Sequence, residues 1–232
     1  MQIHTAATQA HRVPAAVALG LTQRPVQSRP QAPSRAPTHD LQRALVKGEE
    51  LYVEGDEAEH FFKVISGAVR TSKLLDDGRR QIDAFHLPGD IFGLEAGAAH
   101  RFSAEAVGDA VVIGFRRCRL DTLGSADPAL REQALRATLV SLERAQEHLL
   151  LLGRKSAQEK LASFLLEMSQ RLGSQSFDLP MQRGDIADHL GLTIETVSRT
   201  LTRFAREGLI GLKGLSRHVE LRNRSALSQL DA

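Results

Sequence analysis

The sequence predicts an α+β protein in which a β-rich unit is followed by a long helix and a small, mostly helical unit. Three observations lead to this fold class. Short apolar runs separated by turns extend from about residue 46 to residue 115, leucines at heptad spacing follow Pro128, and two short amphipathic helical patterns flank Gly191. We therefore expect four segments, at residues 1–40, 41–125, 126–153 and 154–232.

The composition is that of an ordinary globular chain. Of its 232 residues, 42% are hydrophobic and 25% are charged, and the formal net charge is +2. Cys118 is the one cysteine, so an internal disulfide is excluded and a reducing compartment is expected. There is no apolar run of the roughly 18 residues that a membrane span needs. We expect a cytoplasmic protein with no membrane association.

Residues 1–40 differ from the rest of the chain. They are rich in alanine, glutamine, proline, arginine and serine, and Asp40 is the first acidic residue. The repeated prolines interrupt any helix. We expect a disordered basic arm, which acts either as a solvated tail or as a contact for phosphate backbones.

The second segment has the pattern of many short strands. Apolar runs at residues 51–53, 61–65, 68–71 and 111–113 alternate with the turns 54–56, 66–67, 76–78 and 88–90, each of which contains glycine. Strands at this regular spacing predict a β-sandwich or a barrel-like roll.

A long helix is predicted after Pro128. Its heptad positions alternate in steps of four and three residues, and they are Leu135, Leu139, Leu142, Gln146 and Leu149. We interpret this stripe as a homodimer seam whose one polar member, Gln146, fixes the register; the alternative is a helix that lies on its own β-roll. Gly153 is expected to mark a hinge or a helix break before the next unit. A second amphipathic helix then covers residues 155–172 and stops at Gly173.

The segment 182–207 predicts a helix-turn-helix. Ile186, Ala187 and Leu190 form the apolar face of a short helix, and Gly191 permits a turn with positive φ. Thr193 is placed to cap a second helix from Ile194 to about Glu207. The buried face of that helix is expected to contain Val197, Leu201 and Phe204. Two helices that cross at a small residue and a glycine corner are typical of this DNA-binding motif.

The other face of the second helix carries polar groups suited to double-stranded DNA. We predict that Glu195, Ser198 and Arg199 read bases, since arginine can bond guanine and a carboxylate can accept from cytosine. Residues 208–210 and 217–221 read as the two strands of a wing. The predicted contacts to the DNA backbone are Thr193, Thr196, Thr202, Arg203, Lys213 and Arg217. The alternative is a solvated helix with an ion pair between Glu195 and Arg199.

The order of these units resembles the CRP/FNR superfamily over about residues 45–222. Residues 195–199, Glu-Thr-Val-Ser-Arg, are similar to the recognition helix of the FNR and FixK branches, and residues 93–97 and 102–106 also resemble the FixK branch. The resemblance implies a double-stranded β-helix like a cyclic-nucleotide-binding roll, a long dimerisation helix and a winged helix-turn-helix. It further implies a homodimeric activator that recognises TTGAT-N4-ATCAA, recruits RNA polymerase and controls low-oxygen or nitrogen-metabolism genes.

The resemblance implies three candidate effectors, a cyclic nucleotide, an iron–sulfur cluster and haem, and we expect no bound cofactor. A cyclic nucleotide requires Phe-Gly-Glu and a later arginine with a hydroxyl residue, whereas here Leu94 follows Gly93 and Phe102 follows Arg101. An iron–sulfur cluster requires several cysteines, and Cys118 is alone.

Three ways in which an effector or oxidation gates DNA binding remain as alternatives. Haem has candidate axial ligands in His60, His86, His100 and His148. Cys118 lies among arginines that favour an oxidisable thiolate. The third alternative is a cyclic nucleotide, which the residues after Gly93 and Arg101 disfavour. An enzyme is not expected, because no His-x-His pair, nucleophile elbow or phosphate-binding loop occurs. A further alternative to a DNA-binding regulator is a ligand-binding β-roll whose helix-turn-helix is vestigial.

Overall fold

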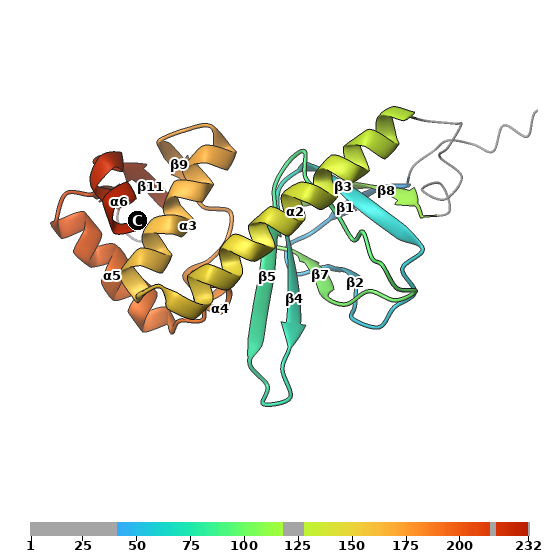
Figure 1. Cartoon of the computed structure of the whole chain (residues 1–232), viewed down its shortest axis with the longest axis horizontal. Helices are drawn as coiled ribbons and strands as arrows, with labels where there is room; N and C mark the ends of the chain where they lie inside the picture. Colours follow the sequence, from blue (N-terminus) through green and yellow to red (C-terminus); the bar gives the residue numbers. More distant parts are fainter. Residues whose placement is uncertain (1–40, 118–127, 214–216, 232) are drawn as a thin grey trace, which may run out of the picture. The chain divides into compact units, whose positions relative to one another are not determined.

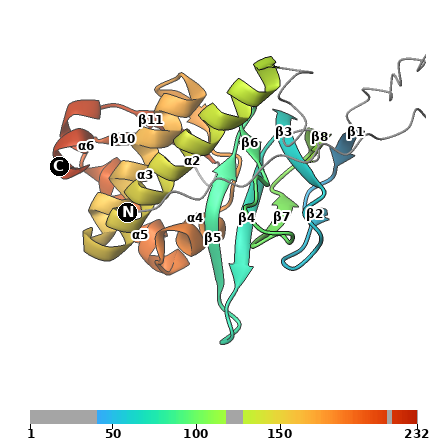
Figure 2. The same ribbon diagram turned by 45° about the vertical axis from the view of Figure 1, so that its right-hand side comes forward.

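The computed structural model describes residues 41–117, 128–213 and 217–231. The predicted basic arm, residues 1–40, and Cys118 lie outside this part of the chain. The first described range forms two four-stranded antiparallel sheets, with strand orders β1-β8-β3-β6 and β2-β7-β4-β5 (Figure 2). The strands are β1 Leu41–Leu45, β2 Glu50–Tyr52, β3 His60–Ser66, β4 Val69–Leu74, β5 Arg80–His86, β6 Ile91–Phe92, β7 Ser103–Ala106 and β8 Ala110–Arg116.

Alternating side chains of these strands build the core of the β-roll. Val64, Val69 and Val112 are completely buried, one on each of three different strands. Gly67 makes the reversal between β3 and β4 with φ of 77°. A Cβ atom at this position would collide with the backbone carbonyl of Asp109, so only glycine fits. The β-roll expected from the sequence is confirmed.

The long helix α2 covers Pro128–Arg154 (Figure 1). It ends at Arg154, one residue after Gly153. The next helix is capped by Ser156, whose hydroxyl accepts from the Glu159 N–H while the Glu159 carboxylate accepts from the Ser156 N–H at 2.6 Å. This capping box begins a new helix directly after the break. The new helix, α3, covers Ala157–Leu172 and ends at Gly173 as predicted, with φ of 65°.

The C-terminal unit combines helices with a small sheet. Its remaining elements are β9 Ser176–Asp178, α4 Arg183–Leu190, α5 Ile194–Arg206, β10 Ile210–Leu212, β11 His218–Leu221 and α6 Arg224–Asp231. The sheet has the order β10-β11-β9. The first wing strand begins at Ile210, two residues later than predicted, because the Leu209 N–H still bonds the Phe204 carbonyl at the end of α5. The sequence analysis did not predict β9 or α6.

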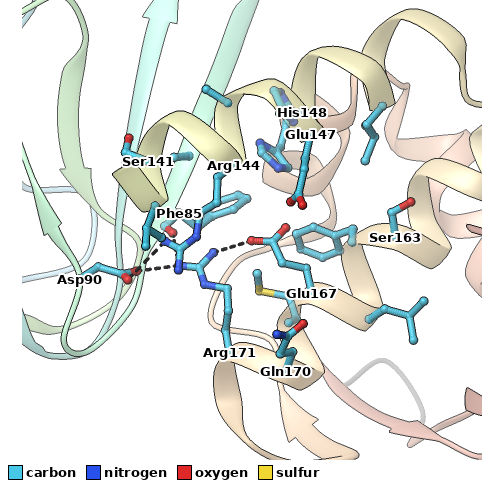
Figure 3. A pocket seen from close by; sticks show the side chains of 18 of the residues that line it. Phe85, Asp90, Ser141, Arg144, Glu147, His148, Ser163, Glu167, Gln170 and Arg171 are labelled. Carbon is cyan, nitrogen blue, oxygen red and sulfur yellow. Dashed lines mark hydrogen bonds and ion pairs between the residues drawn. The ribbon is translucent and has the colours of Figure 1, made fainter. Parts of the chain in front are cut away.

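A groove of about 800 Å³ lies between α2, α3 and the segment that joins β5 to β6. Figure 3 shows Arg144 of α2 and Arg171 of α3 reaching Asp90 from two sides. The shortest distances from guanidinium to carboxylate are 3.3 Å for Arg144 and 2.7 Å for Arg171. Burial alone would raise the pKa of Asp90, but the two arginines and the Leu87 N–H together lower it below its usual value.

Two histidines stack where α2 meets α4. The ring centroids of His148 and His189 are 4.2 Å apart. The His189 Nδ1 bonds the Ile82 carbonyl of β5 at 3.1 Å, so the neutral ring donates this hydrogen bond. Burial lowers the pKa of His189 to about 3, and burial also lowers the pKa of His148. Because both rings are neutral in the fold, their protonation opposes folding.

We expect the free energy of unfolding to fall as the pH is lowered from 6.5 toward 3, because the unfolded chain binds a proton that folded His189 does not. Each pH unit inside this window removes up to about 1.4 kcal/mol through His189. Urea unfolding at a series of pH values measures the slope. His189→Asn keeps a donor for the Ile82 carbonyl and should flatten the slope by about one proton. An unchanged slope would contradict this assignment.

Candidate nucleic-acid interface

The turn between α4 and α5 has the geometry that the sequence predicted. Gly191 adopts φ of 61°, and the Leu192 N–H bonds the Ala187 carbonyl at 2.9 Å. Ala187 is 3% exposed, so its small side chain lets the two helices approach closely. Thr193 caps α5 by accepting from the Thr196 N–H at 3.2 Å. These contacts form a helix-turn-helix.

The buried face of α5 fixes which side of the helix points outward. Val197, Leu201 and Phe204 are each at most 3% exposed, as predicted. Since these residues are three or four apart, they hold one face of α5 against the core. Glu195 and Arg199 are exposed on another face. Within the described residues they make no ion pair with each other, whereas Arg203 pairs with Glu207 at 2.7 Å.

The hydroxyl groups of α5 have different hydrogen-bond partners. Thr200 and Thr202 donate to the backbone carbonyls four residues earlier, at 2.8 Å and 2.9 Å. The Ser198 hydroxyl instead accepts from the Arg183 guanidinium at 3.3 Å. Arg183 is the first residue of α4 and was not among the predicted site residues. A pair of residues 15 apart on two helices leaves no periodic signal that would have revealed it.

The wing adds basic groups beside the helix-turn-helix. Lys213 and Arg217 are both exposed, at the end of β10 and at the start of the β11 segment. The Arg217 guanidinium donates to the Pro180 carbonyl at 2.6 Å, which ties this side chain to the segment before α4. The predicted turn between the two residues includes 214–216, which lie outside the described part of the chain.

The first helix of the motif is held by charged side chains of the β-roll. One oxygen of the Asp185 carboxylate accepts from Arg70 at 2.9 Å and from Arg80 at 2.8 Å. Its other oxygen accepts from the Gln182 N–H at the start of α4. Arg80 also bonds Asp188, one turn further along α4. The sequence signals only the helix-capping role of Asp185, because both arginines are more than 100 residues away.

Both ends of α4 are therefore fixed by long-range contacts. Lys160 of α3 is 8% exposed, and its ammonium group donates to the Leu190 carbonyl at the C-terminal end of α4. A cation at this end of a helix also interacts favourably with the helix dipole. Gln81 of β5 donates to the neighbouring His189 carbonyl at 3.2 Å.

The segment that would face a cyclic phosphate has a different donor set. Arg101 is exposed and its guanidinium lies 5.9 Å from the ring centroid of Phe102, where a hydroxyl residue would be needed. The Glu95 carboxylate accepts from the Arg101 N–H and lies 3.6 Å from the His100 ring. The His100 ring in turn stacks on Tyr52, with centroids 3.6 Å apart. These residues do not fit a cyclic nucleotide.

The histidines considered for haem are dispersed. His60 lies near Phe62, His86 stacks on Phe92, His100 stacks on Tyr52, and His148 stacks on His189. In the part of the chain that the structure describes, no three histidine, cysteine, aspartate or glutamate residues gather as a metal site. None of the described helices combines the length and hydropathy that a membrane span requires.

Comparison with known proteins identifies the family. A Crp-like helix-turn-helix domain matches residues 159–230, and a cyclic nucleotide-binding domain matches residues 42–127. The nitrogen fixation regulation protein FixK of Azorhizobium caulinodans is 49% identical over 194 residues, which cover 81% of this chain and 78% of FixK. The chain belongs to the CRP/FNR family. It is a DNA-binding transcription regulator, and its relatives are regulators rather than enzymes.

Two further relatives agree with this placement in the CRP/FNR family. The fumarate and nitrate reduction regulatory protein of Escherichia coli K12 is 36% identical over 198 residues, which cover 82% of this chain and 78% of that protein. The structure of FixK2 from Bradyrhizobium japonicum has a TM-score of 0.78 and 47% identity, and the match covers 83% of this chain and 98% of FixK2. The predicted fold class and the FixK-like assignment are confirmed.

We expect Asp185→Asn to lower the free energy of unfolding by about 3 kcal/mol, because it leaves half-buried Arg70 with one fewer anionic partner. Asparagine preserves the shape of the side chain and can still accept from the Gln182 N–H. Asp188→Asn is the matched control, since the Asp188 side chain is 33% exposed and its pair with Arg80 should contribute about 1 kcal/mol or less. Equal losses in the two variants, measured by urea unfolding, would argue against the Asp185 contacts.

Proposed function

We propose that this regulator binds an inverted repeat of the type TTGAT-N4-ATCAA as a homodimer and activates transcription. Glu195, Ser198 and Arg199 of α5 read base edges in the major groove. The observation that carries this proposal is the orientation of α5, whose apolar face is buried while Glu195 and Arg199 are exposed. An arginine beside a carboxylate suits a G·C base pair, in which guanine presents two acceptors and cytosine presents an amino group.

The surrounding polar groups supply contacts to phosphates. Thr193 and Thr196 lie at the N-terminal end of α5, where backbone N–H groups and the helix dipole favour an anion. Thr202 and Arg203 lie further along the helix, and Lys213 and Arg217 belong to the wing. These contacts set the position of the protein on the duplex, and they make its affinity depend on salt.

The exposed leucines of α2 support pairing of two chains. Leu135, Leu139, Leu142 and Leu149 are 55–72% exposed, and they recur at heptad spacing on one side of the helix. The buried residues Leu130, Ala134 and Leu151 lie on the side that packs against the chain's own fold. A second copy of α2 would cover the exposed leucines and set Gln146 against its counterpart. Two recognition helices then enter successive major grooves about 34 Å apart.

The wider role of the protein follows from its relatives. The names of FixK and of the fumarate and nitrate reduction regulator point to genes of nitrogen metabolism or low-oxygen respiration. We propose that the β-roll recruits RNA polymerase in the cytoplasm, and that DNA binding needs no bound cofactor. Gating by haem or by oxidation of Cys118 is the alternative, and Cys118 lies outside the described residues.

We expect the ligand-free protein to bind a TTGAT-N4-ATCAA duplex at least about a thousandfold more tightly than a scrambled duplex at physiological salt. A gel-shift titration measures this ratio, with reductant and cyclic AMP added separately. Binding that needs an addition would support the gated alternative. Equal binding to both duplexes under every condition would contradict the proposed recognition and favour a vestigial motif.

Arg199→Ala should cost about 1–3 kcal/mol per half-site and relax selectivity at one base pair. The loss arises because an arginine can bond two guanine acceptors that alanine cannot reach. Arg206→Ala, which removes an exposed arginine near the end of α5, is the control and should leave selectivity unchanged. Binding to single-base variants of the duplex distinguishes the two. Full selectivity in Arg199→Ala would remove Arg199 from the base-reading set.

Leu142→Glu should convert the dimer to a monomer at micromolar concentration, because it places a charge in the apolar seam. Ser141→Glu introduces the same charge at the neighbouring exposed position, about 100° around the helix, and should remain dimeric. Sedimentation velocity reports the oligomeric state of both variants. A dimeric Leu142→Glu would place the interface elsewhere.

A further inference from the structure

The contact between Arg183 and Ser198 joins the two helices of the motif at the face that the proposed function assigns to DNA. Arg183 begins α4, and its Nη1 lies 3.3 Å from the Ser198 Oγ on α5. Both residues are half-buried, so water competes less for this bond than on an open surface. Ser198 lies one turn after Glu195 and directly before Arg199, between the two exposed groups proposed to read bases.

The chemistry of this bond fixes the role of the serine hydroxyl. A hydroxyl has one hydrogen to donate and two lone pairs that accept, and it ordinarily rotates to suit its partner. A guanidinium has only N–H donors and keeps its charge at all physiological pH values. The Ser198 oxygen must therefore accept from Arg183, and its own hydrogen is left to point elsewhere.

In the part of the chain that the structure describes, no backbone carbonyl accepts that hydrogen. Thr200 and Thr202 of the same helix donate their hydroxyl hydrogens to carbonyls four residues earlier, which is the common local use of such groups in a helix. Among the described residues, the side-chain hydrogen bond of Ser198 is the one with Arg183. Its hydroxyl hydrogen is therefore available for a partner outside the protein.

We propose that Arg183 determines specificity by positioning Ser198 as a hydrogen-bond donor toward the bases. A donor selects edges that present an acceptor, such as thymine O4, guanine O6 or a purine N7. It disfavours cytosine, which presents an amino group at the position of thymine O4. This inference rests on the proposed function, since it requires α5 to lie in the major groove.

The competing explanation for the place of Arg183 is that it contacts a DNA phosphate. The phosphate-contact role and the positioning role predict different results. Loss of a phosphate contact lowers the affinity for every duplex equally. It also reduces the slope of log affinity against log salt concentration by about one. A positioning role instead reduces the preference at one base pair, and that effect depends on the presence of Ser198.

The test compares duplexes in which each thymine of the half-site is replaced in turn by 5-methylcytosine, with guanine opposite. This change keeps the methyl group and exchanges the O4 acceptor for an N4 donor. Fluorescence anisotropy at fixed salt gives the dissociation constants for the wild type, Arg183→Ala, Ser198→Ala and the double variant. Arg203→Ala serves as a control, because Arg203 is an exposed cation of α5 that does not contact Ser198.

We expect Ser198→Ala and Arg183→Ala to lose about fivefold of the preference for thymine at the same position, which corresponds to one hydrogen bond. The double variant should lose no more of this preference than Ser198→Ala alone. Arg203→Ala should weaken binding equally on all duplexes. Thermal unfolding of each variant confirms that it is folded at the assay temperature. If Arg183→Ala is not folded, Arg183→Met replaces it, because methionine keeps an extended side chain but has no hydrogen-bond donor.

Three results would overturn the inference. The first is an Arg183→Ala variant that weakens binding uniformly with its thymine preference intact, which would make Arg183 a phosphate contact. The second is additive loss of preference in the double variant, which would mean that the two residues act independently. The third is a wild-type protein that does not select the TTGAT repeat at all, which would overturn the proposed function together with this inference.

Discussion

The placement of the helix-turn-helix, α4 and α5, depends on the carboxylate of Asp185. One side chain, 8% exposed, caps the start of α4 and accepts from two arginines of the β-roll. Such a buried charge is tolerated because both of its oxygens accept from donors, two of which are charged, and it becomes costly if one donor is lost. Since α4 packs directly on α5, the strands that hold Asp185 also set the direction of the exposed face of α5, which we propose reads bases.

The helix-turn-helix was predictable because its signals are local. Ala187, Gly191 and Thr193 lie within seven consecutive residues, and each has one steric or hydrogen-bonding reason for its place. The outward face of α5 followed from the spacing of its apolar residues. The β-roll was predictable as a class from its turns, but the order of its strands was not, because strand pairing joins residues far apart in the chain.

What the sequence did not predict depends on such distant contacts or on weak local patterns. The pairs formed by Arg70 and Arg80 with Asp185 link residues more than 100 positions apart, and no periodicity marks them. The short elements β9 and α6 carry too few residues for a reliable pattern. The break after α2 lies one residue from Gly153, but the capping box at Ser156 that begins α3 was not predicted.

The two faces of α2 have a consequence for how this family can change over time. One face presents the leucine seam, while the other supplies Arg144 to Asp90 and His148 to the stack with His189. Substitutions can alter either face alone, but loss or gain of a single residue rotates everything downstream by about 100°. Leu149 would then leave the seam in the same step as His148 leaves its partner. The length of this helix is therefore under tighter constraint than the identity of most of its residues.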